Sequence, residues 1–342
     1  MRFSRTVTML LGVALAWPLN MATASAEEVN VYSARKEQLI KPLLEEFSRE
    51  TGIEVNLITS KADALLKRLE TEGENSPADV LITTDAGRLH RAKEAGVLQP
   101  AITEALQKQV PANLQDKDHY WLGLTTRARV IVYAKDRVDP SELSTYEALA
   151  DDKWRNRICI RSSNNIYNQS LVASMIAHKG AEATEEWAKG LVKNFARKPA
   201  GGDRDQVKAV AAGQCDIAVV NTYYLGQMIH SSDPAQREAA AQIDIFWPNQ
   251  DDRGAHVNVS GIAITKAADN KANALKLVDF MLSPEAQAWY AEVNHEYPAV
   301  EGVAWSDTLK DWGQFESDAL NLSRLGELNT QALQIMDRAG WR

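Results

Sequence analysis

The chain contains few of the residues that build the commonest protein metal sites. Its 342 residues include only two cysteines and six histidines. The cysteines, Cys159 and Cys215, have no histidine cluster beside them, so they make a poor zinc site of the usual cysteine–histidine kind. In an oxidising compartment this pair is expected to form a disulfide, and two separate buried thiols are the alternative.

Sequence motifs of catalysis are also missing. There is no Ser-His-Asp set, nucleophile motif, phosphate-binding glycine loop or dinucleotide fingerprint, so we expect no enzymatic activity. The histidines lack a metal-like spacing to one another, and we interpret all six as surface or structural residues. They are His90, His119, His178, His230, His256 and His295.

Positive charge is in deficit. The chain has 38 lysines and arginines against 46 aspartates and glutamates, which gives a formal net charge of −8 at pH 7. A nucleic-acid-binding protein needs a basic face to meet phosphates. We therefore expect no nucleic-acid partner, whereas a cation remains compatible with this charge.

Only the N-terminus contains a sustained apolar run. Arg2 and Arg5 precede apolar residues from Val7 to about Trp17, and a small-residue sequence, Ala24-Ser25-Ala26, follows before Glu27. This layout predicts a signal peptide over residues 1–26 and export to the periplasm, and the run is short of the ~20 residues of a membrane anchor. Removing it takes away two positive charges, so the net charge becomes −10, and leaves 316 residues, enough for two domains.

Strand and helix patterns alternate along the rest of the chain. Such alternation predicts α/β lobes with largely parallel sheets. No long linker separates two halves, so we expect the chain to cross between two lobes more than once and to form a cleft. Strands are expected at 29–33, 53–58, 78–82, 129–133, 157–160, 215–220 and 257–265. Helices are expected at 38–51, 62–72, 144–150, 170–179, 184–195, 203–212 and 271–282, before Gly96 and through the last forty residues, where Leu320, Leu328 and Leu333 are candidate core residues.

Tyrosines follow two of these expected strands, and in both places a helix is expected directly after the tyrosine. Residues 158–160 lead into a segment that ends at Tyr167, and residues 217–220 lead into Tyr223 and Tyr224, with a helix expected after each segment. Ligands bind beyond the carboxyl ends of strands in open α/β sheets. The repeated placement therefore favours a binding site, although tyrosine pairs also occur in cores and interfaces.

Phenols suit ferric iron. Fe³⁺ is a hard cation that prefers anionic oxygen ligands, and a bound cation favours the deprotonated phenol. Three phenolates would balance its charge and leave coordination positions for carbonate or another small anion. Arg127 and Arg129 lie two apart on one expected strand and share a face, so we interpret them, with Thr126 beside them, as the anion contacts.

At these residues the chain resembles the periplasmic ferric-ion-binding proteins, the solute-binding subunits of bacterial iron ABC importers. The resemblance covers essentially all of the chain after residue 26. The stretches that carry it are 29–35, 76–80, 126–133, 166–170, 212–216, 221–224 and 282–287.

The resemblance implies an α/β fold of the two-lobed periplasmic-binding-protein type (type II-like), with a hinged ligand cleft. It implies that Tyr167, Tyr223 and Tyr224 hold Fe³⁺, and that the chain, expected to be a monomer, delivers the ion to an inner-membrane permease. The expected first lobe is 27–126 plus about 251–301, and the second is 127–250 plus about 302–342.

One departure from the family pattern concerns the first lobe. Many relatives add a His or Tyr ligand after the Tyr-Ser-x-Arg stretch, where this chain has Lys36 and Glu37, and others use a carboxylate where this chain has Thr84. We therefore expect all protein ligands to come from the second lobe, with Glu37 and Asp85 as weak candidates. A binding protein for a small organic anion or polyamine, using Arg127 and Arg129, is the alternative.

Overall fold

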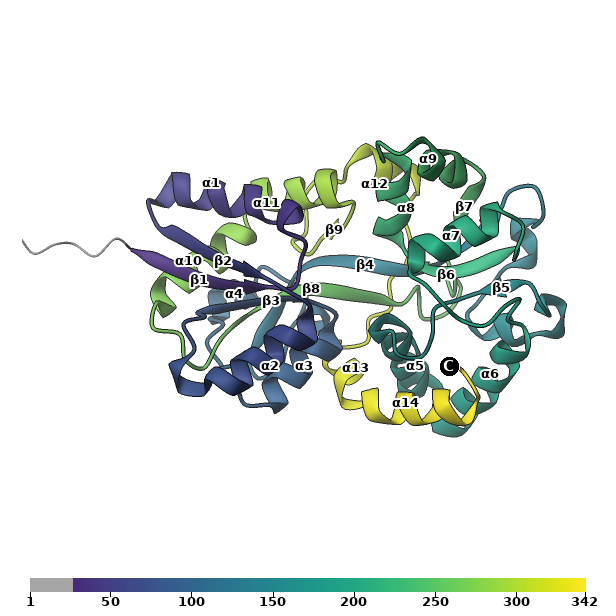
Figure 1. Ribbon diagram of the computed structural model, residues 1–342, viewed down its shortest axis with the longest axis horizontal. Coiled ribbons are helices and arrows are strands. Elements are labelled where there is room, and N and C mark those ends of the chain that lie inside the picture. The colour runs from purple at the N-terminus through teal and green to yellow at the C-terminus, as the bar shows by residue number, and fades with distance from the viewer. Residues whose placement is uncertain (1–26) are drawn as a thin grey trace, which may run out of the picture.

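The computed structural model describes residues 27–342, and the expected signal peptide, residues 1–26, lies outside the described residues. Two groups of helices and strands lie side by side, joined in the middle by β4 (Trp121–Ala134) and β8 (Val257–Ile264), as Figure 1 shows. The predicted two-lobed α/β fold is confirmed. No helix within residues 27–342 is long and apolar enough to cross a membrane.

The strands of the described chain form one mixed sheet. Its order is β2-β1-β3-β8-β4-β6-β5, with β7 and β9 paired to β4. Parallel pairing is restricted to β1–β2, β1–β3 and β5–β6, so the prediction of largely parallel sheets is wrong. The reason is that β4 and β8 pass between the lobes in opposite directions and pair antiparallel with each other. The remaining strands are β1 (Glu28–Ser33), β2 (Glu54–Thr59), β3 (Val80–Thr84), β5 (Ile158–Cys159), β6 (Ile217–Asn221), β7 (Ile243–Phe246) and β9 (Tyr297–Pro298).

The first lobe packs helices against β1, β2 and β3. Helix α1 buries Leu43, Leu44 and Phe47, and Phe47 meets Phe280 edge-on with ring centres 5.5 Å apart. The helix ends at Gly52, whose φ of 74° is the left-handed conformation that glycine adopts without strain. The helices are α1 (Lys41–Thr51), α2 (Ala62–Glu72), α3 (Ala86–Glu94), α4 (Glu104–Gln107), α10 (Lys271–Met281) and α11 (Pro284–Trp289).

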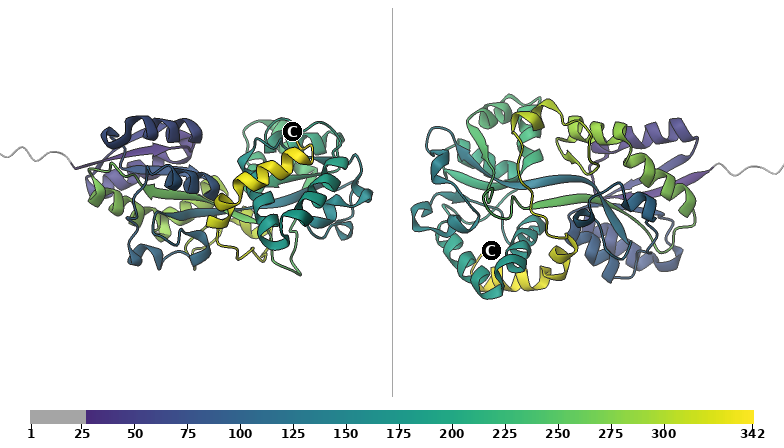
Figure 2. Two further views of the ribbon diagram at one scale, coloured as in Figure 1. Left: turned by 90° about the horizontal axis from the view of Figure 1, so that it is seen from below. Right: turned by 180° about the vertical axis from the view of Figure 1, so that it is seen from behind.

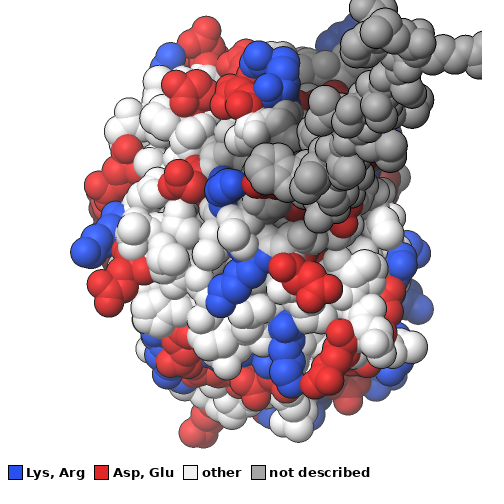
Figure 3. All heavy atoms as spheres, turned by 90° about the vertical axis from the view of Figure 1, so that its left-hand side faces the viewer, with Lys and Arg blue, Asp and Glu red and all other residues white. Residues whose placement is uncertain are grey.

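Acidic and basic side chains alternate over the visible part of the first lobe's end, which faces the viewer in Figure 3. The negative net charge of the chain is therefore not gathered into one patch on this visible face.

The second lobe surrounds β5 and β6 with helices, and the C-terminal segment covers it. Helix α14 packs against α5 and α6, and the buried Trp341 meets Trp187 and Phe195 edge-on. Figure 2 shows this last helix, in yellow, lying along the second lobe. The helices are α5 (Ile166–Lys179), α6 (Ala181–Lys193), α7 (Asp203–Ala211), α8 (Thr222–Ile229), α9 (Pro234–Ala241), α12 (Asp307–Asp311), α13 (Ser323–Glu327) and α14 (Asn329–Arg338).

A disulfide joins the two segments that lead to the tyrosines. Cys159, at the end of β5, is bonded to Cys215, which precedes β6, and their Cα atoms are 5.8 Å apart. The predicted disulfide is confirmed. Both cysteines are buried inside the second lobe. The bond between them ties the neighbouring strands β5 and β6 together.

Candidate metal centre

Tyr167 lies in the first turn of α5. The helix begins at Ile166, and the side chain of Asn165 caps it by accepting a hydrogen bond from the backbone N–H of Asn168. The sequence pattern had predicted a start at Ser170, after the tyrosine. The earlier start fixes the direction of the Tyr167 side chain, because a residue in a capped first turn has a defined backbone conformation.

Tyr223 and Tyr224 occupy the equivalent place in α8. Strand β6 ends at Asn221, and the helix follows directly at Thr222. The two rings lie next to each other, with centres 4.3 Å apart and planes tilted by 35°. All three tyrosines are half-buried at the start of a helix that follows a strand of the second lobe.

The structure brings the three tyrosines together. The Tyr223 hydroxyl donates a hydrogen bond to the Tyr167 hydroxyl at 3.3 Å, although 56 residues separate them. The ring of Tyr224 lies beside that of Tyr223, so the three phenols come together at one place. Hydroxyl oxygens at this separation can bind one small cation together.

These phenols face a cavity of ≈ 190 Å³ between the lobes. The first lobe contributes residues near the end of β1, the end of β3 and the segment before β9. The second lobe contributes the tyrosines and two polar residues. The lining residues are Ala34, Arg35, Lys36, Leu39, Thr84, Glu296, Tyr167, Arg204, Tyr223, Tyr224 and Gln227.

The acidities of the three phenols differ. Burial raises the pKa of Tyr167, but the Arg127 guanidinium and the hydrogen bond from Tyr223 outweigh it, so this pKa lies below the ordinary 10.0. Burial and the negative charge of an ionised Tyr167 raise the pKa of both Tyr223 and Tyr224. Tyr167 is therefore the phenol that ionises first, and its negative charge holds the proton on the other two.

Arg127 is one of two arginines that lie next to the ring of Tyr167, the other being Arg161. The Arg127 side chain is 1 % exposed, and its Cζ lies 5.9 Å from the centre of the Tyr167 ring. Nη1 donates to Ser260 Oγ at 3.3 Å, while Nε and Nη2 have no hydrogen-bond partner among the described residues. Buried guanidinium donors are costly to leave unpaired, so this arrangement suits a small anion beside the tyrosines.

None of the three expected anion contacts lines the tyrosine cavity, although Arg127 lies next to Tyr167. Thr126 is adjacent to Arg127 on β4, so its side chain lies on the opposite face, where it lines a separate cavity with Tyr297. Arg129 is 1 % exposed and donates to Asp203, Asn221 and Asn168 inside the second lobe. Arg127 and Arg129 are alternate residues of β4, but Arg129 is bonded inside the second lobe whereas Arg127 lies next to Tyr167.

The two weak carboxylate candidates have other partners. Glu37 is exposed and forms a salt bridge with Lys41 at 2.9 Å. Asp85 is fully buried at the start of α3, where it accepts hydrogen bonds from Gly87 N, Ser170 Oγ and Asn258 Nδ2 at 2.8 to 2.9 Å. The hydrogen bonds of Glu37 and Asp85 are thus made to residues other than the three tyrosines.

Sequence reasoning missed residues that the fold adds to the cavity. Arg35 and Glu296 form a buried salt bridge at 3.0 Å, and Ser260 accepts from Arg35 at 2.6 Å. Arg204, in the first turn of α7, donates to Gln227 and lies over the ring of Tyr224. Arg35 lies within residues 29–35, which carry the family resemblance, but no sequence pattern links it to Glu296.

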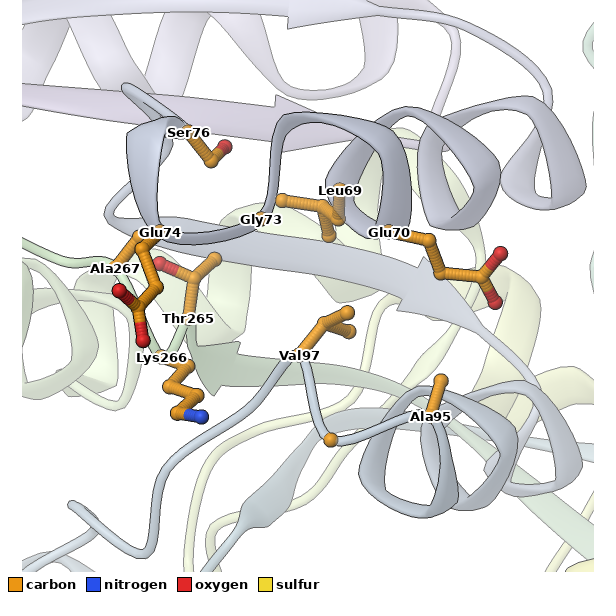
Figure 4. A pocket seen from close by; sticks show the side chains of 11 residues that line it. Leu69, Glu70, Gly73, Glu74, Ser76, Ala95, Val97, Thr265, Lys266 and Ala267 are labelled. Atoms are coloured by element: carbon orange, nitrogen blue, oxygen red, sulfur yellow. The ribbon is translucent and has the colours of Figure 1, made fainter.

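Conventional ligand clusters do not compete with the tyrosines. Within residues 27–342 no group of three or more His, Cys, Asp or Glu side chains could hold a metal ion. A cavity of the same volume, ≈ 190 Å³, lies in the first lobe between the end of α2 and the turn at Gly96. Figure 4 shows that Leu69 and Val97 line it together with a few charged side chains, without a tyrosine.

Comparison with known proteins places the chain among binding proteins. Residues 75–316 match the family model described as bacterial extracellular solute-binding protein. The chain is 48 % identical to iron uptake protein A1 of Synechocystis over 325 residues, which cover 95 % of this chain and 90 % of the relative. It is 29 % identical to the major ferric iron-binding protein of Neisseria meningitidis, over 96 % of this chain and 97 % of the relative.

Solved structures give the same result. A Trichodesmium protein in complex with iron and citrate ligands has 50 % sequence identity and a TM-score of 0.90, over 92 % of this chain and 100 % of that one. The ferric binding protein of Campylobacter jejuni has 42 % identity and a TM-score of 0.87, over 92 % and 100 %. These relatives are solute-binding proteins of iron transport and not enzymes. The expected family and the expectation that the chain is not an enzyme are confirmed, and the chain belongs to the bacterial extracellular solute-binding proteins, in the group of ferric-ion-binding proteins.

Proposed function

We propose that this chain captures ferric iron in the cavity between its lobes through the phenolates of Tyr167, Tyr223 and Tyr224. The observation that carries the proposal is the convergence of three phenols from two separate helix starts, with two of the oxygens 3.3 Å apart. A packing role for tyrosine gives no reason for the hydroxyls to meet at a cavity. The names of the relatives, which are iron uptake and ferric iron-binding proteins, support the same cargo.

The chemistry of the proposal follows from charge. Three phenolates balance one Fe³⁺, and the ion displaces the phenol protons because a bound trivalent cation stabilises the ionised ligand. Tyr167, whose pKa is already lowered by Arg127, is the first to bind. Tyr223 and Tyr224 keep their protons until the cation arrives, since burial raises the pKa of each.

A small anion, carbonate or another, completes the coordination in this proposal. Arg127 has two buried donors, Nε and Nη2, that no described residue uses, and it lies beside Tyr167. The start of α5 adds backbone N–H groups at the same place, and a helix start favours negative charge. Thr126 and Arg129 are not part of this proposed anion site, because their side chains lie elsewhere.

Delivery and compartment are part of the proposal. Residues 1–26 act as the signal peptide, and the exported monomer binds iron in the periplasm. The lobes, divided near residues 126, 250 and 301, rotate about β4 and β8 to enclose the ion, as is general for hinged binding proteins. An ABC permease of the inner membrane then takes the ion from the closed form.

The test is a visible absorbance titration of metal-stripped protein with a ferric chelate, with and without bicarbonate. We expect a phenolate-to-iron charge-transfer band that saturates at one equivalent and depends on the anion. The absence of this band, together with unchanged stability on iron addition, would reject tyrosine ligation.

The alternative cargo is a small organic anion. The cavity is lined by three cationic side chains, Arg35, Lys36 and Arg204, and its carboxylate, Glu296, is already paired with Arg35. This balance argues against a polyamine, which needs free carboxylates. Calorimetry of metal-free protein with a panel of organic anions separates the two functions, because an anion cargo would bind without iron.

A further inference from the structure

We infer that Arg129 is a positioning residue for the ferric site, which sets the distance between the two helix starts that carry the tyrosines. This inference rests on the proposed function. Arg129 lies on β4, and its side chain neither lines the cavity nor bonds to the hydroxyl of Tyr167, Tyr223 or Tyr224. Its guanidinium instead bonds to residues next to the tyrosines on both sides.

One bond of Arg129 reaches helix α5. Nη2 donates to Oδ1 of Asn168, the residue after Tyr167, at 2.5 Å. The amide nitrogen of Asn168 donates to the backbone oxygens of Arg161 and Ser162 at 2.8 and 3.3 Å. Asn168 is thus held through both ends of its side-chain amide, and the first turn of α5 is held with it.

A second set of bonds reaches the start of α8. Nη1 donates to Oδ1 of Asn221 at 2.9 Å, and Nη2 donates to the backbone oxygen of Val219 at 3.2 Å. Asn221 precedes the Thr222–Ile229 helix but gives no side-chain cap to it, because its oxygen is bonded to Arg129. The segment that leads to Tyr223 is therefore fixed by the same guanidinium as α5.

Asp203 completes the network and balances its charge. Its Oδ2 accepts from Arg129 Nη1 at 3.3 Å and from the backbone N–H of Asn221 at 2.9 Å. Its Oδ1 accepts from Arg161 at 3.3 Å, and Arg161 lies over the ring of Tyr167 at 5.8 Å. Arg129 and Asp203 are 1 % and 0 % exposed, so the pair is shielded from solvent and depends on these bonds.

The planar shape of arginine explains why it is needed here. Its two terminal nitrogens donate in fixed directions and can hold two partners at a set separation, whereas lysine offers a single nitrogen. Asn168 and Asn221 are those two partners. Asn168 directly follows Tyr167 and Asn221 lies two residues before Tyr223, and the hydroxyls of these two tyrosines are 3.3 Å apart. Groups behind the direct ligands commonly orient them in this way.

The experiment compares the variants R129K and R129M/D203N with the wild type. R129K keeps the charge that Asp203 needs but cannot hold both helix starts, and R129M/D203N removes both charges of the buried pair. The matched control is R253K, because Arg253 is another arginine with a largely covered side chain, 8 % exposed, that pairs with Glu147 at 2.6 Å and is absent from the tyrosine cavity. Each protein is titrated with ferric iron in competition with citrate, at several bicarbonate concentrations, and its thermal midpoint is measured.

We expect both Arg129 variants to bind ferric iron about 10- to 100-fold more weakly, the range usual for residues behind metal ligands. The charge-transfer band should shift in position, the dependence on bicarbonate should stay as in the wild type, and R253K should keep wild-type affinity and band. A wild-type band and affinity in R129K and R129M/D203N, with only a lowered thermal midpoint, would reduce Arg129 to a structural residue.

A change confined to the bicarbonate dependence would make Arg129 an anion contact and overturn the inference. Failure of the proposed function itself is distinguishable, because then the wild type would show no band at all.

Discussion

Tyr167 and Tyr223 place their phenolic oxygens 3.3 Å apart, and each follows a cysteine of the Cys159–Cys215 disulfide by eight residues. The bond therefore joins the two segments that lead to the tyrosines at positions equally far before Tyr167 and Tyr223 in the sequence. Since β5 and β6 run parallel as neighbours, both chains leave the sheet at the same edge and deliver their tyrosines to one place.

Removing the disulfide should destabilise the second lobe. We expect Cys159→Ala/Cys215→Ala to lose about 2–5 kcal/mol of unfolding free energy, because the bond closes a loop of 56 residues and limits the unfolded chain. Urea unfolding of the oxidised wild type and the variant measures the loss. An unchanged urea midpoint would mean that the bond contributes no stability, and the wild type after reduction should match the variant.

Arg127 should control the anion dependence of iron binding. In Arg127→Gln the two donors without a described partner and the charge beside Tyr167 are lost, so iron affinity should fall and cease to respond to bicarbonate. Ferric titrations across bicarbonate concentrations measure this response. Arg91→Gln is the control, because Arg91 pairs with Asp63 on the surface. A bicarbonate response that survives in Arg127→Gln would contradict the assignment.

Tyr167 should ionise before any free tyrosine does. Its folded pKa lies below the ordinary 10.0, so the ionised phenol stabilises the folded state. That stability is fully present above the unfolded pKa of about 10 and is lost as the pH falls through the lower folded value. An ultraviolet titration of metal-free protein should show one phenol ionising early, and Tyr167→Phe should remove that step. Persistence of the early step in Tyr167→Phe would assign it to another residue.

Gly226 should be intolerant of a side chain. It lies in α8 after the tyrosine pair, and a Cβ there would come within 2.7 Å of Cβ and Cγ of His295, which belongs to the segment before β9. We expect Gly226→Ala to cost about 1–3 kcal/mol of stability, typical of overpacking, and to weaken iron binding by displacing α8. Thermal unfolding and the ferric titration together check this. Wild-type values in both would show that His295 moves aside freely.

Elements with a clear apolar face were predicted well from the sequence. The helix expected at 62–72 is α2 with the same bounds, because Leu65 and Leu69 form one buried face and Gly73 ends it. Where the apolar pattern was weaker, packing against the rest of the protein determined the structure instead. The helix expected at 144–150 is a 3-10 turn over Glu147–Ala150, and Leu333, expected in the core, is 38 % exposed because α14 buries Ala332, Ile335 and Met336 instead.

The sequence allowed prediction of those residues of the candidate site that come directly after a strand. A strand followed by a tyrosine and a helix is visible in the sequence, and this pattern identified all three phenols. The periodicity of β4 placed Arg127 and Arg129 on one face, but it could not show that Asp203 pairs with Arg129. The contribution of Glu296 depends on a contact across more than 250 residues, with Arg35, for which the sequence holds no local signal.

The central claim, that phenolates hold the ion, is tested most directly by Tyr223→Phe/Tyr224→Phe. Phenylalanine keeps the rings and their packing but removes two of the three oxygens. We predict that this double variant keeps its fold and loses both the charge-transfer band and tight ferric binding, while the control Tyr120→Phe, on the first lobe, retains both. Unchanged iron affinity in the double variant would contradict the account.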